Sequence, residues 1–274
     1  MDNRPDNRPD NRPIGVFDSG VGGLTVAKQI MAAMPNEQII YFGDSLRMPY
    51  GERDADDLEN LSARIIAFLM GRNIKALVVA CGSISSKIFD RVRTQVPQGF
   101  PIFEMVTPAI TATLAATKNE KIGVLATAGT VASGTHERLF KQVLPKAEIT
   151  PVAAPLFAPL IEEGWTGNEV AQLTAKVYLE PFTNSGIDTL LLACTHFPLM
   201  HDAIAKALPR GVQIIDPAIQ LAIDISRQIE KRATDDRPHD AAHEFYTTAK
   251  QAKFDALAQM FLGRAISSQF VILP

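Results

Sequence analysis

The stretch Asn73-Ile-Lys-Ala-Leu-Val-Val-Ala-Cys81 is echoed later in the chain by Gly186-Ile-Asp-Thr-Leu-Leu-Leu-Ala-Cys194. Each is a short run rich in leucine and valine, the pattern of a strand buried on both faces. Each ends in one of the chain's two cysteines. Because ligands bind at the carboxyl ends of strands in open parallel sheets, two equivalent strands would present two equivalent thiols to one cleft. Such a pair suits a reaction that needs a base on one side of its substrate and an acid on the other.

A second echo supports duplication of one structural unit. Ile14-Gly-Val-Phe-Asp-Ser-Gly-Val-Gly22 resembles Ile122-Gly-Val-Leu-Ala-Thr-Ala-Gly-Thr130. The offset is 122 − 14 = 108 residues for this pair and 194 − 81 = 113 residues for the two cysteines. A single echo could also arise by chance, because buried parallel strands are generally rich in Val, Ile and Leu. Two echoes in the same order favour duplication.

Composition narrows the class of protein. The chain has 274 residues, 46% of them hydrophobic and 21% charged, as in a globular protein of one large domain or two ordinary ones. A net charge of −3 predicts neither nucleic acid nor an anionic membrane as a partner. No apolar run approaches the roughly 20 residues of a membrane helix, and the N-terminus lacks an apolar signal core. We therefore expect a cytoplasmic enzyme whose two cysteines are reduced thiols.

The order of elements predicts an α/β fold. Residues 2–13 repeat Asp-Asn-Arg-Pro three times, so residues 1–13 are expected to be a disordered tail. Strands and helices then alternate, with strands over 38–42 and 76–80 and helices over 23–33, 56–71 and 85–96. Two more helices and a final strand over 270–273 are expected to complete the first domain. We predict two similar parallel-sheet domains, 14–105 plus 214–274 and 106–213, with the active site in the cleft between them.

The glycine-rich loop after the first strand indicates a small zwitterion. Asp18 and Ser19 lie where a strand meets a helix, whose free N–H groups attract anions. Thr25 stands where the third glycine of a dinucleotide motif would be, and Asp18 would repel phosphate. An α-amino acid offers both an anion for Ser19 and a cation for Asp18. The alternative role for Asp18 is an ordinary helix cap.

Two further segments lie near the expected cleft. Pro49-Tyr50-Gly51 follows the second strand and makes a rigid turn whose amides and phenol suit a carboxylate. His196 comes two residues after the second cysteine, but one Cys/His pair falls short of zinc spacing, so no metal site is expected. A Cys/His hydrolase would leave the first cysteine unexplained.

These motifs resemble those of the glutamate racemases, in the aspartate/glutamate racemase superfamily. The matching stretches are Ile14-Gly-Val-Phe-Asp-Ser-Gly-Val-Gly-Gly-Leu24, Tyr41-Phe-Gly-Asp44, Pro49-Tyr-Gly51, Leu77-Val-Val-Ala-Cys81 and Leu192-Ala-Cys-Thr-His-Phe-Pro-Leu199. The likeness runs from residue 14 almost to the C-terminus. It implies interconversion of L- and D-glutamate without a cofactor, for peptidoglycan synthesis, by a homodimeric enzyme.

The resemblance also implies a role for each matched residue. Cys81 would act on D-glutamate with help from Asp18, and Cys194 would act on L-glutamate. His196 and Glu162, the first acid after Pro159-Leu-Ile161, would assist Cys194. Asp18 and His196 would also contact the substrate, together with Ser19, Pro49, Tyr50, Gly51 and Thr195. Gly82 and Ser83 occupy two further substrate-binding positions of the family.

One departure from the family pattern follows the first cysteine. The family normally has Asn-Thr there, whereas this chain has Gly82-Ser83. Ser83 keeps a hydroxyl, but Gly82 offers no amide, and losing a hydrogen bond to a charged group costs about 1.5–3 kcal/mol. Three readings stay open: a weaker glutamate racemase, a racemase of another small acidic amino acid such as aspartate, or a paralogue that binds without turnover. Both cysteines and their helpers remain, which favours an active enzyme.

Overall fold

The computed structural model describes residues 10–229 and 242–273. The strands are β1 Ile14–Asp18, β2 Ile39–Gly43, β3 Ala76–Val79, β4 Ile102–Phe103, β5 Lys121–Ala126, β6 Glu148–Ala153, β7 Thr189–Leu192, β8 Gln213–Ile215, β9 Glu244–Thr247 and β10 Ser268–Phe270. The α-helices are α1 Leu24–Ala33, α2 Ala55–Met70, α3 Gly82–Lys87, α4 Phe89–Arg93, α5 Val106–Ala116, α6 Ala128–Ala132, α7 Thr135–Val143, α8 Phe157–Glu162, α9 Glu169–Leu179, α10 His201–Ala207, α11 Pro217–Gln228 and α12 Gln251–Leu262. Short 3₁₀ helices span Glu180–Phe182 and Phe197–Met200.

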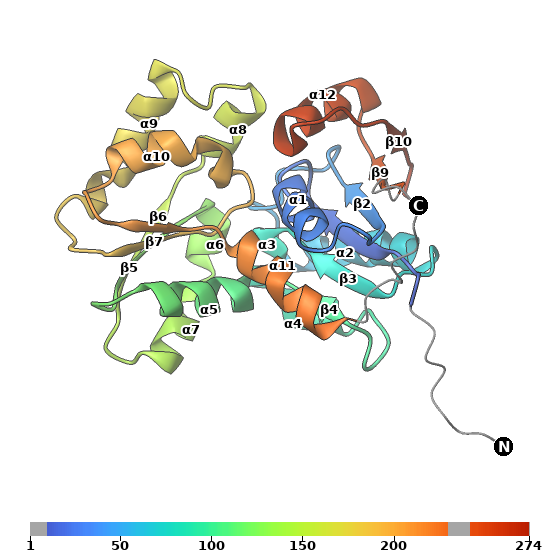
Figure 1. Ribbon diagram of the computed structural model, residues 1–274, viewed down its shortest axis with the longest axis horizontal. Helices are drawn as coiled ribbons and strands as arrows, with labels where there is room; N and C mark the ends of the chain where they lie inside the picture. Colours follow the sequence, from blue (N-terminus) through green and yellow to red (C-terminus); the bar gives the residue numbers. More distant parts are fainter. Residues whose placement is uncertain (1–9, 230–241, 274) are drawn as a thin grey trace.

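Two parallel sheets form the centres of two lobes that lie side by side (Figure 1). The first sheet has the order β10-β9-β2-β1-β3-β4, and the second has the order β6-β5-β7-β8. Every strand pair in both sheets is parallel. The prediction of two parallel-sheet α/β domains is therefore confirmed.

The two sheets repeat each other down to single contacts. Gly15 of β1 pairs with Leu77 of β3, and Gly123 of β5 pairs with Leu190 of β7. A Cβ on Gly15 would lie 2.7 Å from Ile74 Cδ1, and one on Gly123 would lie 2.9 Å from Ile187 Cδ1. The two isoleucines stand at the same place in the two cysteine segments, seven residues before each cysteine. Equivalent glycines thus accommodate equivalent side chains, as duplication predicts.

Some predicted elements end or begin elsewhere. The helix expected over 85–96 begins earlier, directly after Cys81. It is broken at Ile88, where the backbone (φ −139°, ψ 14°) leaves the helical region. The side chain of Ile88 is buried. Strand β9 was not expected, because the run Glu244-Phe-Tyr-Thr247 has too few apolar residues for a buried strand. The last strand ends at Phe270 instead of spanning 270–273.

The C-terminal segment returns to the first sheet, where β9 pairs with β2 and β10 pairs with β9. The sequence-based limits, 14–105 plus 214–274 and 106–213, divide β8, which pairs with β7 of the second sheet. We therefore propose the domain limits 14–105 plus 216–274 and 106–215, of which 230–241 and residue 274 lie outside the described residues. Residues 1–9 of the predicted tail also lie outside them. Residues 10–13 contact the first domain, because the Lys75 N–H donates to Pro13 O (2.9 Å) and Lys75 Nζ donates to Asp10 O (2.8 Å).

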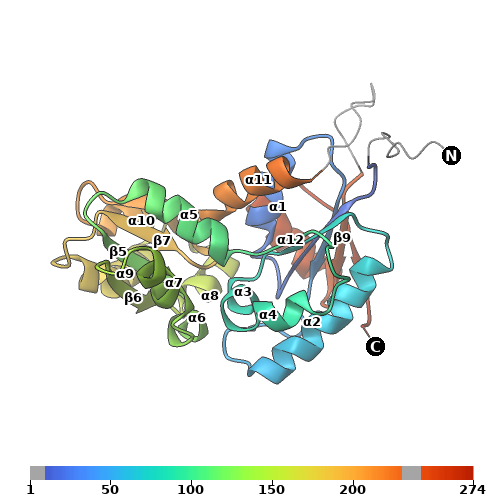
Figure 2. The same cartoon turned by 90° about the horizontal axis from the view of Figure 1, so that it is seen from below.

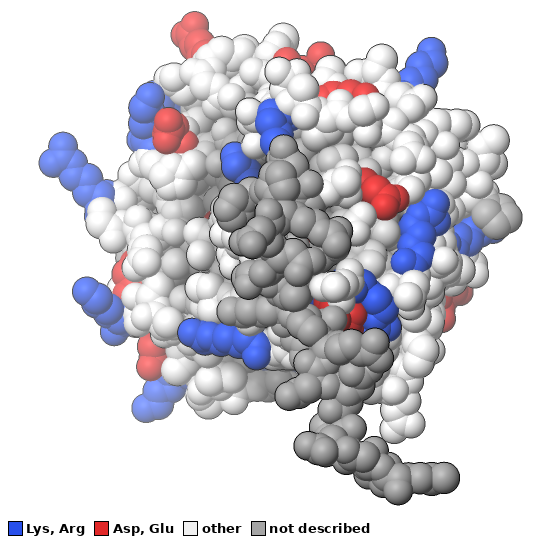
Figure 3. Space-filling view, turned by 45° about the vertical axis from the view of Figure 1, so that its right-hand side comes forward, with Lys and Arg blue, Asp and Glu red and all other residues white. Residues whose placement is uncertain are grey.

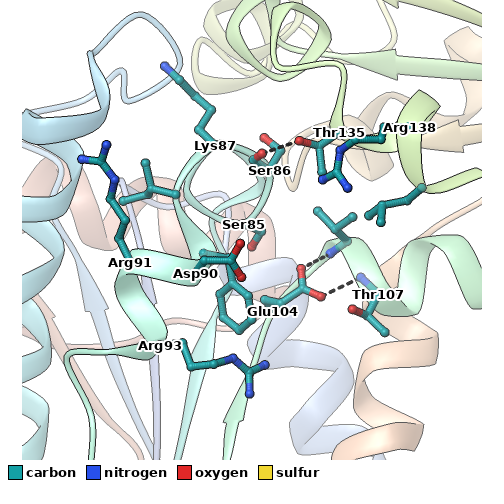
Figure 4. Close-up of a pocket in the computed structure, with 14 residues that line it drawn as sticks. Ser85, Ser86, Lys87, Asp90, Arg91, Arg93, Glu104, Thr107, Thr135 and Arg138 are labelled. Carbon is teal, nitrogen blue, oxygen red and sulfur yellow. Dashed lines mark hydrogen bonds between the residues drawn. The ribbon is translucent and has the colours of Figure 1, made fainter. Parts of the chain in front are cut away.

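The two lobes contact each other through packed helices and through hydrogen bonds beside a polar groove. Helix α11 packs against both α1 and α5, which belong to different lobes (Figure 2). On another side, a groove of about 560 Å³ lies between α3, α4 and α7. There the Thr135 hydroxyl donates to Ser86 O at 2.7 Å, and the Glu104 carboxylate accepts the N–H groups of Val106 and Thr107 at the start of α5 (Figure 4). These contacts order the segment that crosses from one sheet to the other.

The surface carries charges of both signs. On the face drawn in Figure 3, basic and acidic side chains are interspersed among the described residues. Within residues 10–229 and 242–273, no helix is long and apolar enough to cross a membrane.

Candidate active site

A cavity of about 80 Å³ lies between the two domains at the carboxyl ends of β1, β3, β5 and β7. All twelve residues predicted for the site line it, together with Met48, Thr127, Thr130, Ala158 and Ala193. Both cysteines of the chain are among the lining residues, Cys81 from the first domain and Cys194 from the second. The structure therefore brings together what the sequence placed on two separate repeats.

The first thiol lies in a buried, acidic environment. Cys81 is 4% exposed, and its Sγ is 3.8 Å from the Ser19 hydroxyl. Burial, reinforced by the negative charge of Asp18, raises the pKa of Cys81 to about 12. Oδ2 of Asp18 accepts the N–H groups of Gly20 (3.1 Å) and Gly23 (3.0 Å), so this carboxylate orders the loop and also lines the cavity.

The second thiol lies beside a histidine–glutamate pair. His196 Nε2 is 3.0 Å from Oε1 of Glu162, at the end of α8. Burial lowers the pKa of His196, but hydrogen bonding to Cys194 and Glu162 outweighs burial and raises it to about 10. The imidazole therefore carries a proton at neutral pH and supplies positive charge beside the Cys194 sulfur. Glu163, the neighbouring acid, is exposed and does not line the cavity.

The loop that carries Cys194 is held by the first domain. The Thr25 hydroxyl lies 2.9 Å from Thr195 O and 2.9 Å from Gly22 O. A Cβ on Gly22 would lie 2.4 Å from the Thr195 hydroxyl and 2.5 Å from His196 Nδ1. Only glycine allows this approach, and Thr25, noted in the sequence for breaking a nucleotide motif, makes an interdomain contact.

The turn after β2 differs from the expectation in one respect. The phenol of Tyr50 was expected to bind a carboxylate of the substrate, but it donates to Oδ2 of buried Asp44 at 2.5 Å. Asp44 also accepts from the Thr248 hydroxyl (2.6 Å) and from Arg47 (2.9 Å). Among the described residues, no acceptor pairs with the backbone N–H of Tyr50 or Gly51. The amides of the turn, not its phenol, are thus free to bind an anion.

Five lining residues were not predicted from the sequence, and two of them, Thr127 and Thr130, carry hydroxyl groups. Thr127 follows β5 and caps α6 by accepting the Thr130 N–H at 3.3 Å, and the two hydroxyls lie 3.1 Å apart. The duplication offers the signal that would have found the first of them. With the offset of 108 residues, Ser19 corresponds to position 19 + 108 = 127. Thr130 has no comparable signal.

Gly82 and Ser83 occupy the first turn of α3. A Cβ on Gly82 would lie 3.0 Å from Ala193 O, so the backbones of the two cysteine segments approach closely here. The Ser83 hydroxyl would be 3.6 Å from a Cβ on Gly51, near the turn with the free amides. Within the described parts of the chain, no group of three or more His, Cys, Asp or Glu side chains could hold a metal ion.

Fold and site together define a two-domain α/β protein with one thiol from each domain in a shared cavity. The model of the family described as Asp/Glu/Hydantoin racemase matches residues 22–224. A glutamate racemase of Neisseria gonorrhoeae is 39% identical over 254 residues, which are 92% of this chain and 93% of the relative. The chain belongs to the Asp/Glu racemase family and is an isomerase of the amino-acid racemase type. The resemblance drawn from the sequence motifs is confirmed.

Two solved structures support the same grouping. The glutamate racemase isoform RacE1 of Bacillus anthracis has a TM-score of 0.89 at 34% identity, covering 96% of this chain and 98% of that one. The glutamate racemase of Francisella tularensis, solved with D-glutamate, has a TM-score of 0.87 at 34% identity with the same coverage.

Proposed function

We propose that this protein interconverts L-glutamate and D-glutamate by a two-cysteine acid/base mechanism that uses no cofactor. The observation that carries the proposal is that Cys81 and Cys194, at equivalent strand ends of the two domains, line one cavity. Glutamate as the substrate is supported by the relatives, which are named glutamate racemases at 36–40% identity, and by a neighbour solved with D-glutamate.

In the proposed reaction, one proton leaves the α-carbon of the substrate and another is added to the opposite face of the same carbon. With D-glutamate, the Cys81 thiolate removes the α-proton and becomes a thiol. The electron pair stays on the α-carbon as a carbanion conjugated with the carboxylate, and the Cys194 thiol protonates the opposite face to give L-glutamate. With L-glutamate the roles exchange, Cys194 acting as the base and Cys81 as the acid. Proton transfer by positioned groups of this kind contributes about 10²- to 10⁴-fold to a rate.

Each cysteine has a different helper in this mechanism. Asp18 faces Cys81 and, in the proposal, pairs with the substrate ammonium, so the two opposite charges near the thiol offset each other. His196, charged and held by Glu162, stabilises negative charge near Cys194 and near the developing carbanion. Because an adjacent positive charge favours a thiolate, we expect the substrate ammonium to lower the pKa of Cys81.

The two carboxylates of the substrate are assigned to different groups that line the cavity. The free N–H groups of Tyr50 and Gly51 suit the side-chain carboxylate, and Pro49 fixes the turn that presents them. Ser19 and Thr195, beside the two thiols, suit the α-carboxylate and the amino group. Orienting the substrate in this way aligns its α-carbon with the two thiols for proton transfer.

The biological role follows from the product. We propose that the enzyme supplies D-glutamate for peptidoglycan, works in the cytoplasm and forms a homodimer, as the family resemblance implies. Racemisation of aspartate is the second candidate, favoured by the lack of a side chain at Gly82, next to the first thiol.

Proton NMR in deuterium oxide tests the proposal. L-glutamate and D-glutamate are each incubated with the protein, and aspartate is run in parallel. We expect loss of the glutamate α-proton signal together with decay of optical rotation. If only aspartate loses its α-proton signal, aspartate is the substrate instead of glutamate. No exchange with either acid, from folded protein with reduced thiols, would leave a protein that binds without turnover.

A further inference from the structure

A second, smaller cavity lies directly behind the thiol of the second domain. Its volume is about 10 Å³, close to the space that one water molecule needs. Four residues line both this cavity and the reaction cavity, namely Gly82, Ala193, Cys194 and Thr195. The other walls come from Met105, Val106, Ala109, His136 and Pro217. The two cavities thus share one wall, which contains the Cys194 segment.

His136 is the one ionisable side chain of this second cavity other than Cys194. It is 6% exposed, and no hydrogen bond of its side chain is seen within residues 10–229 and 242–273. Burial lowers the pKa of His136 to about 4, so the imidazole is neutral at pH 7. A neutral imidazole has one N–H donor and one acceptor nitrogen. Because buried polar groups are nearly always paired, its partner is to be sought in the cavity that it lines.

Gly82 is part of the shared wall, where it meets the backbone of Ala193. It has no side chain, and a Cβ added there would lie 3.0 Å from Ala193 O. A carbon–oxygen distance of 3.0 Å is tighter than an ordinary van der Waals contact, so the two cysteine segments meet closely here. A residue with a side chain at this position would add atoms to the wall between the two cavities.

We propose that the second cavity binds one water molecule, which His136 holds and which donates a hydrogen bond past Gly82 to the α-carboxylate of the substrate. The α-carboxylate is chosen because the shared wall contains Cys194 and Thr195 and no residue of the turn at Pro49–Gly51. Ala193 O offers the water a second acceptor. His136 is thus a positioning residue, and a water-mediated bond is nearly as favourable as a direct one. This inference rests on the proposed function.

A double-mutant cycle tests the water. His136→Leu removes both nitrogens, and His136→Gln keeps a polar end. In the native background we expect His136→Leu to raise KM for both enantiomers about tenfold, with kcat changed by less than about threefold. His136→Gln should restore KM to within about threefold. In Gly82→Ala the added methyl stands in the wall between the proposed water and the substrate, so KM rises on its own and His136→Leu adds nothing further.

The controls separate folding, binding and turnover. Thermal unfolding of each variant identifies any loss of substrate affinity that comes from a damaged fold. His136→Gln is the matched control, because it changes the same residue but keeps a polar side chain. A His136→Leu variant that folds normally with unchanged KM overturns the inference, as does an equal rise in KM in both backgrounds. The same cycle is also measured as Kd for glutamate by calorimetry. If the wild type binds glutamate without racemising it, the proposed function fails while the cycle in Kd still decides the inference.

Discussion

Replacing Tyr50 by Phe removes one oxygen atom and decides how the turn after β2 works. Its phenol donates to Asp44, whose side chain is fully buried and also accepts from Arg47 and Thr248. A hydrogen bond to a charged group contributes about 1.5–3 kcal/mol. We therefore expect the free energy of unfolding to fall by about 1.5–3 kcal/mol, since Asp44 keeps its other partners. Because the backbone amides bind the substrate in this scheme, KM for glutamate should change by less than about threefold.

The measurement pairs urea unfolding at pH 7 with steady-state kinetics on both enantiomers. Thr248→Val is the matched control, because it removes another hydrogen bond to Asp44 from a residue that does not line the cavity. The two variants should give the same pattern, a loss of stability with nearly native KM. A tenfold or larger rise in KM for Tyr50→Phe with unchanged stability would show that the phenol binds substrate and would refute the reasoning.

Three further predictions concern the thiols and their neighbours. Gly22→Ala should lower kcat about a hundredfold, because the added methyl displaces His196. Gly167→Ala is the control and should leave kcat unchanged, because nothing lies within 4 Å of the added carbon. Steady-state kinetics on both variants test this prediction. Since the pKa of His196 is raised above its usual value, the stability it contributes is present below about pH 6.5 and lost as pH rises toward about 10. Glu162→Gln should reduce that loss, measured as unfolding free energy against pH and contradicted by an unchanged curve. Cys81→Ala should lower racemisation by at least about a thousandfold in both directions, and polarimetry showing one direction intact would contradict the two-base scheme.

The sequence made the architecture predictable because the duplicated segments carry strong, local signals. A buried run that ends in cysteine, used twice, fixes two strands and the edge at which their ligands bind. Gly15 and Gly123 repeat the same close contact with Ile74 and Ile187, so the pattern was more than a shared preference for aliphatic residues. The same reasoning predicts that both thiols face one cleft, and both line one cavity.

Other features depend on contacts between distant segments, which local patterns do not encode. The phenol of Tyr50 is committed to Asp44 by a network that includes Thr248, about 200 residues away. Strand β9 is formed because β2 offers an edge to pair with, not because of its own composition. The second cavity arises from the fit of α7 against the cysteine segments, and nothing in the sequence around His136 marks it.

The pairing of β9 and β10 with β2 also dictates an order of events during synthesis. The second sheet is built from a continuous stretch, β5 to β8, and all of its strands are synthesised before β9. The first sheet, although it starts the chain, must wait for the last strands to cover the edge of β2. A nascent chain that is held before β9 therefore exposes an unpaired strand edge, which is a hazard for aggregation. The half of the protein that is translated first is the half that finishes folding last.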